Sequence, residues 1–223
     1  MATITAPLRA APLRQLTATD TLLTRFDQWL KSSAGPHTAQ RPYPGEEQPE
    51  TVTDPAMRRQ IADLMRVNHA GEICAQALYH GQASTAKHDE VRQSLQQAAQ
   101  EEVDHLAWCA QRLKELNDQP SRLDPLWYAG SYCIGALAGL SGDRYSLGFV
   151  AETENQVIEH LQTHLNQLPQ DDARTRAVLT QMMRDEAQHG HHALEQGGEL
   201  PPTPIKWLMK MTAKIMTHTA QYI

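Results

Sequence analysis

The chain has 223 residues, enough for one sizeable hydrophobic core, and its formal net charge is -6. With 20 Lys and Arg against 26 Asp and Glu and no basic cluster, its composition argues against a nucleic-acid partner. Three widely spaced cysteines without a C-x-x-C pair argue against a disulfide framework and favour a reducing compartment.

Residues 1–50 are rich in Pro, Thr and Ala, and we interpret them as an N-terminal extension with one helix near 20–31 and a Pro-rich loop. Residues 51–223 are predicted to form one all-α catalytic domain, because apolar residues there recur at spacings of three and four. The helices expected in this domain cover residues 55–87, 89–117, 126–140, 142–168, 171–196 and 204–221. No run of about 20 apolar residues exists, so no single helix is predicted to span a bilayer.

Four of these helices carry glutamates on their apolar, inward face. The ionisable residues on these faces are Glu72, Glu102, His105, Glu154, Glu186 and His189. Glu152 is a rival to Glu154, but only Glu154 falls on the same stripe as Leu147, Val150 and Leu161. Burying unpaired carboxylates costs several kcal/mol each, so four of them facing one core require compensation by cations. No Lys or Arg is expected on the four stripes, which argues against a purely structural bundle with buried ion pairs.

The inward residues repeat as two half-sites. Glu72 precedes E-V-D-H at 102–105 by 30 residues, and Glu154 precedes E-A-Q-H at 186–189 by a similar distance. A single glutamate from each of two helices, with Glu-x-x-His from each of two others, is the ligand set of ferritin-like di-iron or di-manganese bundles. We therefore predict a ferritin-like four-helix bundle with an additional hydrophobic crossover helix and a C-terminal amphipathic helix.

A ligating histidine usually donates its second N–H to a carboxylate. Asp185 and Glu101 each directly precede a ligating glutamate, so we expect Asp185 to reach His105 and Glu101 to reach His189. For Glu101 a place on the solvated helix face is an equal alternative.

Two further segments suit contact with a membrane. Residues 126–140 carry no charge and have aromatic residues near their start, as in an interfacial helix, although a buried crossover helix would look the same. Residues 204–221 place apolar side chains on one side and Lys206, Lys210 and Lys214 on another, which fits either anionic lipid or packing with a solvated lysine edge.

The string R-V-N-H-A-G-E at 66–72, followed by E-V-D-H, by Glu154 with His160 six residues later, and by D-E-A-Q-H, resembles the demethoxyubiquinone hydroxylase family. The resemblance covers about residues 55–223. It implies two iron ions per chain on the six inward residues, and it places His160 near the site. One departure is Leu161, which stands where some relatives have a tyrosine after this histidine, so this chain has no tyrosine at that position to relay electrons.

The resemblance also implies a di-iron monooxygenase of ubiquinone biosynthesis, which uses O2 to hydroxylate a membrane-dissolved prenylated benzoquinol, demethoxyubiquinol. The implied partners are a membrane surface, bound peripherally, and accessory proteins of ubiquinone biosynthesis. The implied location is the cytoplasmic face of a bacterial inner membrane, or the matrix side of the mitochondrial inner membrane in a eukaryote. A ferritin-like peroxidase or iron-binding protein of the rubrerythrin type would use the same ligands and is the alternative. No G-x-G-x-x-G fingerprint marks a dinucleotide site, so the electron donor stays open.

Overall fold

The computed structural model describes residues 17–222, which form seven helices and no strand. The helices are α1 (Ala18–Ala34), α2 (Pro55–Thr85), α3 (Asp89–Glu115), α4 (Asp124–Leu140), α5 (Asp143–Gln167), α6 (Ala173–Glu195) and α7 (Thr203–Ala220). The all-α prediction is therefore confirmed, and each helix lies within a few residues of its expected range. Residues 1–16 of the predicted extension lie outside the described residues.

Local sequence signals explain where the bundle helices begin. Asp54 caps α2, because its side chain accepts a hydrogen bond from the Met57 N–H at 2.9 Å. Asp172 caps α6 in the same way, accepting from the Thr175 N–H at 3.1 Å. Gly142 stands directly before α5 and has a φ of 105°, a backbone conformation that residues other than glycine rarely adopt.

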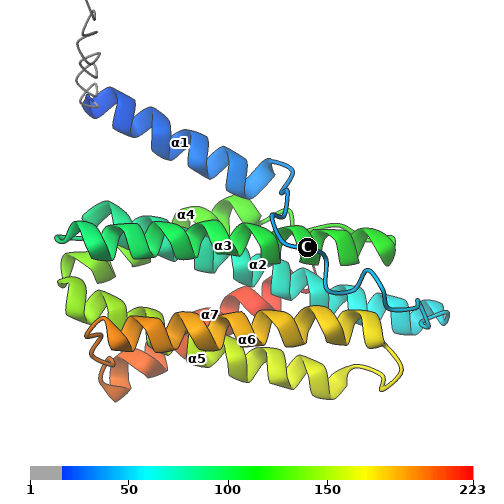
Figure 1. The fold of residues 1–223 in the computed structure, drawn as a ribbon. Coiled ribbons are helices and arrows are strands. Elements are labelled where there is room, and N and C mark those ends of the chain that lie inside the picture. The colour runs from blue at the N-terminus through cyan, green and yellow to red at the C-terminus, as the bar shows by residue number, and fades with distance from the viewer. Residues whose placement is uncertain (1–16, 223) are drawn as a thin grey trace, which may run out of the picture.

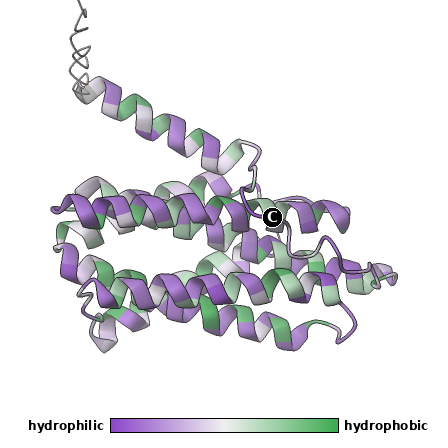
Figure 2. Ribbon diagram, in the orientation of Figure 1, coloured by the Kyte–Doolittle hydropathy of each residue, from purple (hydrophilic) through white to green (hydrophobic). Residues whose placement is uncertain are grey.

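The bundle consists of two helical hairpins packed face to face. In Figure 1, α2 and α3 form the upper layer and α5 and α6 the lower layer. Helix α2 packs against α3 and α5 against α6, and the two hairpins meet where α2 contacts α5 and α3 contacts α6. The main core lies between the layers and includes Met65, Trp108, Cys109, Leu161 and Met182, all nearly inaccessible to solvent. Figure 2 shows that the visible outer turns of α3 and α6 are largely hydrophilic. Any charged group on the inner faces therefore lies in a poorly solvated environment.

Helix α4 is the crossover that connects the two hairpins, and it packs along the outer side of α2. Glycines bring the two helices close together: a Cβ added at Gly135 would lie 2.2 Å from the Leu78 carbonyl oxygen. The opposite side of α4 exposes Leu126, Leu137 and Leu140. One side of α4 is therefore buried against α2, as expected of a crossover helix, and the other side is exposed. Contact of the exposed side with a membrane stays a prediction.

One expectation about the apolar stripes is wrong. Arg112 lies on the inner face of α3 and is fully buried, although no arginine was expected there. Helical periodicity alone could not find it, because two of its partners, Glu50 and Asp172, come from segments remote in sequence.

The segment before residue 51 packs on the bundle. Tyr43 is buried in the main core, and α1 contacts α4 through the Trp29 indole N–H, which donates to the Pro125 carbonyl at 3.1 Å. The predicted domain boundary between residues 50 and 51 stays a prediction. The extension contributes Tyr43 to the core of the catalytic domain.

Helix α7 lies against α2 and α5. Lys206 pairs with the rival glutamate, Glu152, at 2.7 Å, and Lys210 pairs with Glu159 at 2.9 Å. Two of the three lysines thus bind carboxylates of α5, while Trp207 and Leu208 are exposed. None of the described helices is both long enough and apolar enough to cross a membrane.

Candidate metal centre

The four bundle helices bring their inward carboxylates and histidines to one place in the core. Glu72 lies on α2, Glu102 on α3, Glu154 on α5 and Glu186 on α6, and all four are nearly inaccessible to solvent. Each occupies the middle of a long helix, so the helix backbone fixes its position. The helices thereby hold four acids that solvent does not screen.

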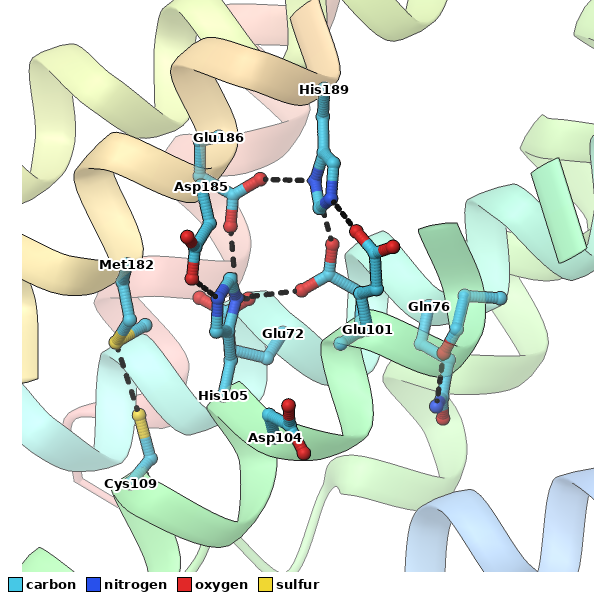
Figure 3. Close-up of polar contacts among 12 residues, drawn as sticks. Glu72, Gln76, Glu101, Asp104, His105, Cys109, Met182, Asp185, Glu186 and His189 are labelled. Atoms are coloured by element: carbon cyan, nitrogen blue, oxygen red, sulfur yellow. Dashed lines mark hydrogen bonds and ion pairs between the residues drawn. The ribbon is translucent and has the colours of Figure 1, made fainter. Parts of the chain in front are cut away.

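The two histidines point the same ring nitrogen, Nδ1, at these carboxylates (Figure 3). His105 Nδ1 lies 2.9 Å from Glu102 Oε2, 3.1 Å from Glu186 Oε1 and 3.4 Å from Glu72 Oε2. His189 Nδ1 lies 3.1 Å from Glu186 Oε2 and 3.5 Å from Glu102 Oε1. Ligand atoms of Glu72, Glu102, His105 and Glu186 all lie within 4.8 Å of one another, so this buried group could hold a metal ion.

Glu154 lies beside this group rather than inside it. The Tyr79 hydroxyl donates a hydrogen bond to Glu154 Oε1, and the Tyr79 ring lies edge-on to the His189 ring with centroids 6.2 Å apart. Tyr79 stands seven residues after Glu72, two helical turns along the same face of α2. The structure thus brings Tyr79, which sequence reasoning did not single out, into contact with a predicted ligand.

Several acids and bases of the cluster have pKa values far from their ordinary ranges. Burial raises the pKa of Glu72 and of Glu154 well above the ordinary range, and neighbouring carboxylates raise both further. Burial alone would lower the pKa of His189, but its hydrogen bond to Glu186 and nearby carboxylates outweigh burial and raise it to about 11. Because metal ligands must be deprotonated, a divalent cation would displace these protons on binding.

Unsatisfied atoms indicate that the donor set fits metal ions. One oxygen each of Glu72, Glu102, Glu154 and Glu186 is buried without a satisfied hydrogen bond among the described residues. Three of these oxygens share a histidine Nδ1 at 3.1–3.5 Å, and Glu154 Oε2 lacks even such a contact within the described part of the chain. Buried polar atoms are rarely left unpaired, and an orphaned carboxylate oxygen costs on the order of 1–3 kcal/mol or more. Carboxylates and imidazoles together suit divalent iron, manganese and zinc. The cluster therefore has residue types that bind such metal ions and buried oxygen atoms that lack a satisfied hydrogen bond.

The outer nitrogens of the histidines contact two further carboxylates. Asp185 Oδ2 lies 3.0 Å from His105 Nε2, and Glu101 Oε2 lies 2.7 Å from His189 Nε2, each on the opposite hairpin from its histidine. With Nε2 engaged in this way, Nδ1 is the nitrogen left to face a metal. The role of Asp185 and Glu101 in orienting the two histidines remains a prediction, and these contacts are consistent with it.

His160 lies elsewhere on α5. Its ring lies against that of His164 in a tilted arrangement, with centroids 4.0 Å apart and an interplanar angle of 59°, and burial lowers the pKa of His160. Among the described residues it makes no hydrogen bond to the carboxylate cluster, so its predicted place near the site stays a prediction.

Sequence reasoning did not single out Arg41. Its guanidinium binds Asp185 and also Asp104, the residue before His105. Helical periodicity in the sequence could not predict these contacts, because Arg41 lies in the irregular segment between α1 and α2, far from both partners in sequence.

A helical bundle with four buried glutamates and two Glu-x-x-His pairs has the residue arrangement of the class of carboxylate-bridged metal-binding bundles. Within that class, the family model described as ubiquinone biosynthesis protein COQ7 matches residues 59–220, and the chain belongs to this family.

Curated relatives agree with this assignment over nearly the whole chain. A protein of Acinetobacter baumannii named 3-demethoxyubiquinol 3-hydroxylase is 56% identical over 214 residues, which is 95% of this chain and 100% of the relative. Proteins with the same name from Azotobacter vinelandii and Nitrosomonas europaea are 51% and 50% identical, covering 94% and 92% of this chain and 98% of each relative.

Proposed function

We propose that the protein is an O2-dependent monooxygenase of ubiquinone biosynthesis, which hydroxylates the ring of a prenylated demethoxyubiquinol. The observation that carries this proposal is the buried cluster of carboxylates and histidines in a chain 50–56% identical to proteins named for this reaction. We assign two iron ions per chain to Glu72, Glu102, His105, Glu154, Glu186 and His189. When bound, the iron pair would supply reductive activation of O2.

The protein's own residues prepare the site in three ways. Glu186 lies between the two histidines and contacts both, so it can serve both halves of the centre. The Tyr79 hydroxyl orients Glu154. Trp108 and Cys109, both fully buried, help keep bulk water away from the α3 side of the cluster.

The experiment that tests this function counts iron and then follows product. Purified protein should contain about two irons per chain after anaerobic loading with ferrous iron. Reduced with a short-chain demethoxyubiquinol analogue and exposed to O2, it should form the hydroxylated quinol in an iron-dependent manner. Iron uptake and O2 consumption without hydroxylated quinol would instead favour the peroxidase alternative.

We further propose that the protein binds peripherally to the cytoplasmic face of a bacterial inner membrane, where its quinol dissolves. Exposed apolar residues gather at the end of the bundle where α4 ends, α5 begins and α7 begins; they are Leu137, Leu140, Tyr145, Leu200, Ile205, Trp207 and Leu208. The Glu199 N–H donates to the Arg144 carbonyl at 3.0 Å, which joins these segments.

A cavity of about 70 Å³ at the same end supports substrate approach from this side. His189, Tyr79 and Leu147 line it together with Gln97 and His192, which are exposed at the surface. It is too small for a quinol ring as it stands, so surface side chains such as Gln97 must move to admit one. Accessory proteins of ubiquinone biosynthesis that deliver the lipid would bind near this opening.

Membrane binding is tested by placing a charge in the apolar end. Leu140→Glu and Trp207→Glu should each reduce co-sedimentation with phosphatidylethanolamine–phosphatidylglycerol vesicles about tenfold, since burying such a side chain contributes about 1.5–3 kcal/mol. Gln162→Glu, an exposed site on α5 away from this end, is the matched control and should leave binding unchanged. Equal binding by all three variants would contradict the proposed surface.

A further inference from the structure

Arg41 joins the two hairpins on the outside of the metal centre. Its Nε donates to Asp104 Oδ2 at 2.6 Å, and its Nη1 donates to Asp185 Oδ2 at 2.8 Å. The neighbouring backbone N–H of Gln40 donates to the other oxygen of Asp104 at 2.6 Å. One arginine from the segment between α1 and α2 thereby links a carboxylate of α3 to a carboxylate of α6.

The contact continues from Arg41 to a predicted ligand. The Asp185 oxygen that accepts from Arg41 is the same atom that lies 3.0 Å from His105 Nε2 (Figure 3), and the other oxygen accepts from Gln181 at 2.9 Å. The guanidinium also lies over the Trp108 ring, 4.8 Å from its centroid, and Trp108 packs against the His105 ring. Asp185 and the His105 ring are therefore fixed from two directions.

The other half of the centre is held differently. Glu101, which contacts His189 Nε2, has a side chain that is 41% exposed, whereas the side chain of Asp185 is 10% exposed. Within residues 17–222 no lysine or arginine pairs with Glu101, and its second oxygen accepts only from Gln97 at 3.0 Å. An exposed pair of this kind is weak, so His189 is less firmly oriented than His105.

We propose that Arg41 is a positioning residue that makes the two repeated half-sites unequal, so that iron on the His105 side is released more slowly than iron on the His189 side. The inference rests on the proposed metal centre and adds to it a difference between the two ions. Removal of an outer partner of a metal-bound histidine typically costs 10–100-fold in metal affinity, and Arg41 fixes that partner.

The positive charge of Arg41 acts in the opposite direction, because it repels a cation. Two carboxylates, Asp104 and Asp185, lie against the guanidinium at 2.6 and 2.8 Å, so the group of three carries a net negative charge. Orientation of His105 should therefore outweigh repulsion by the arginine.

Iron release measures this inequality without relying on turnover. Protein loaded anaerobically with ferrous iron is mixed with an excess of a ferrous chelator, and colour formation is followed over time. The wild-type chain should release its iron in a fast and a slow phase of similar amplitude. Arg41→Ala leaves Asp185 itself in place, so it should accelerate the slow phase by about 10-fold, the lower end of that range, while the fast phase stays unchanged. Arg41→Lys, which keeps the charge but loses the two-pronged contact, should fall between them.

Two control variants separate this role from general loosening. Tyr43→Phe removes the hydrogen bond from the same segment to Glu115 and leaves Arg41 in place, and Arg59→Ala removes an exposed arginine of α2. Both should keep the wild-type slow phase. Equal acceleration of both phases, acceleration by Tyr43→Phe, slower release from Arg41→Ala, or a single phase in the wild type would each overturn the inference. Failure of the wild type to take up about two irons would instead reject the metal centre on which it rests.

Discussion

Replacing Glu186 by alanine is expected to abolish metal binding and hydroxylation while the chain stays folded. Glu186 Oε1 lies 3.1 Å from His105 Nδ1 and Oε2 lies 3.1 Å from His189 Nδ1, so its loss affects both halves of the centre at once. We expect iron affinity to fall by more than about 100-fold, since the change removes a ligand and not merely an outer partner. Turnover should fall in parallel.

Helicity should survive this substitution, because alanine is the best helix former and α6 packs through Val178, Leu179 and Met182. Iron per chain, far-ultraviolet circular dichroism and product formation are the measurements. Glu186→Gln, which keeps the shape and removes the charge, should also lose iron. Glu195→Gln changes an exposed glutamate of the same helix and should retain it. Two irons and normal turnover in Glu186→Ala would show that the ligand assignment is wrong.

Replacing Arg112 by methionine is expected to lower the free energy of unfolding by about 3–5 kcal/mol, because removing one partner of a buried ion pair leaves a carboxylate without compensation. The fully buried guanidinium binds Glu50 at 2.6 Å, Glu115 at 3.0 Å and Asp172 at 3.3 Å, and its Nε donates to the Thr175 hydroxyl at 2.8 Å. Asp172 is itself buried, so it has no solvent to take the place of the arginine.

Denaturant unfolding of the metal-free protein measures this loss. A second change, Asp172→Asn, should restore part of it in the Arg112→Met background, because asparagine still caps α6 and carries no charge. Arg59→Ala, at an exposed position of α2, should change the free energy of unfolding by less than about 0.5 kcal/mol. If Arg112→Met behaved like Arg59→Ala, the carboxylates around it would have to be neutral or solvated in the folded chain.

The sequence was sufficient to predict the bundle and the cluster because both follow helical periodicity. Glu102 and His105 share one face of α3, and Glu186 and His189 repeat that arrangement on α6. The contacts that sequence reasoning missed depend on irregular segments or on distant partners. Arg41 lies in a segment without periodicity and meets Asp185 across the bundle, and Arg112 is compensated by Glu50 and Asp172. The two faces of α4 could not be distinguished either, because small and apolar residues occur on both.

The contacts between Asp185 and His105 and between Glu101 and His189 have a consequence for how the two hairpins depend on each other. The same offset along the chain relates Glu101 to Asp185 and His105 to His189. The contacts are therefore reciprocal, as in an isologous dimer whose subunits each lend the same group to the other. In this respect the single chain behaves as a covalently joined dimer of hairpins. In each hairpin the Nε2 of the histidine contacts an acid of the other hairpin, so replacing that acid should alter the predicted metal ligand across the bundle.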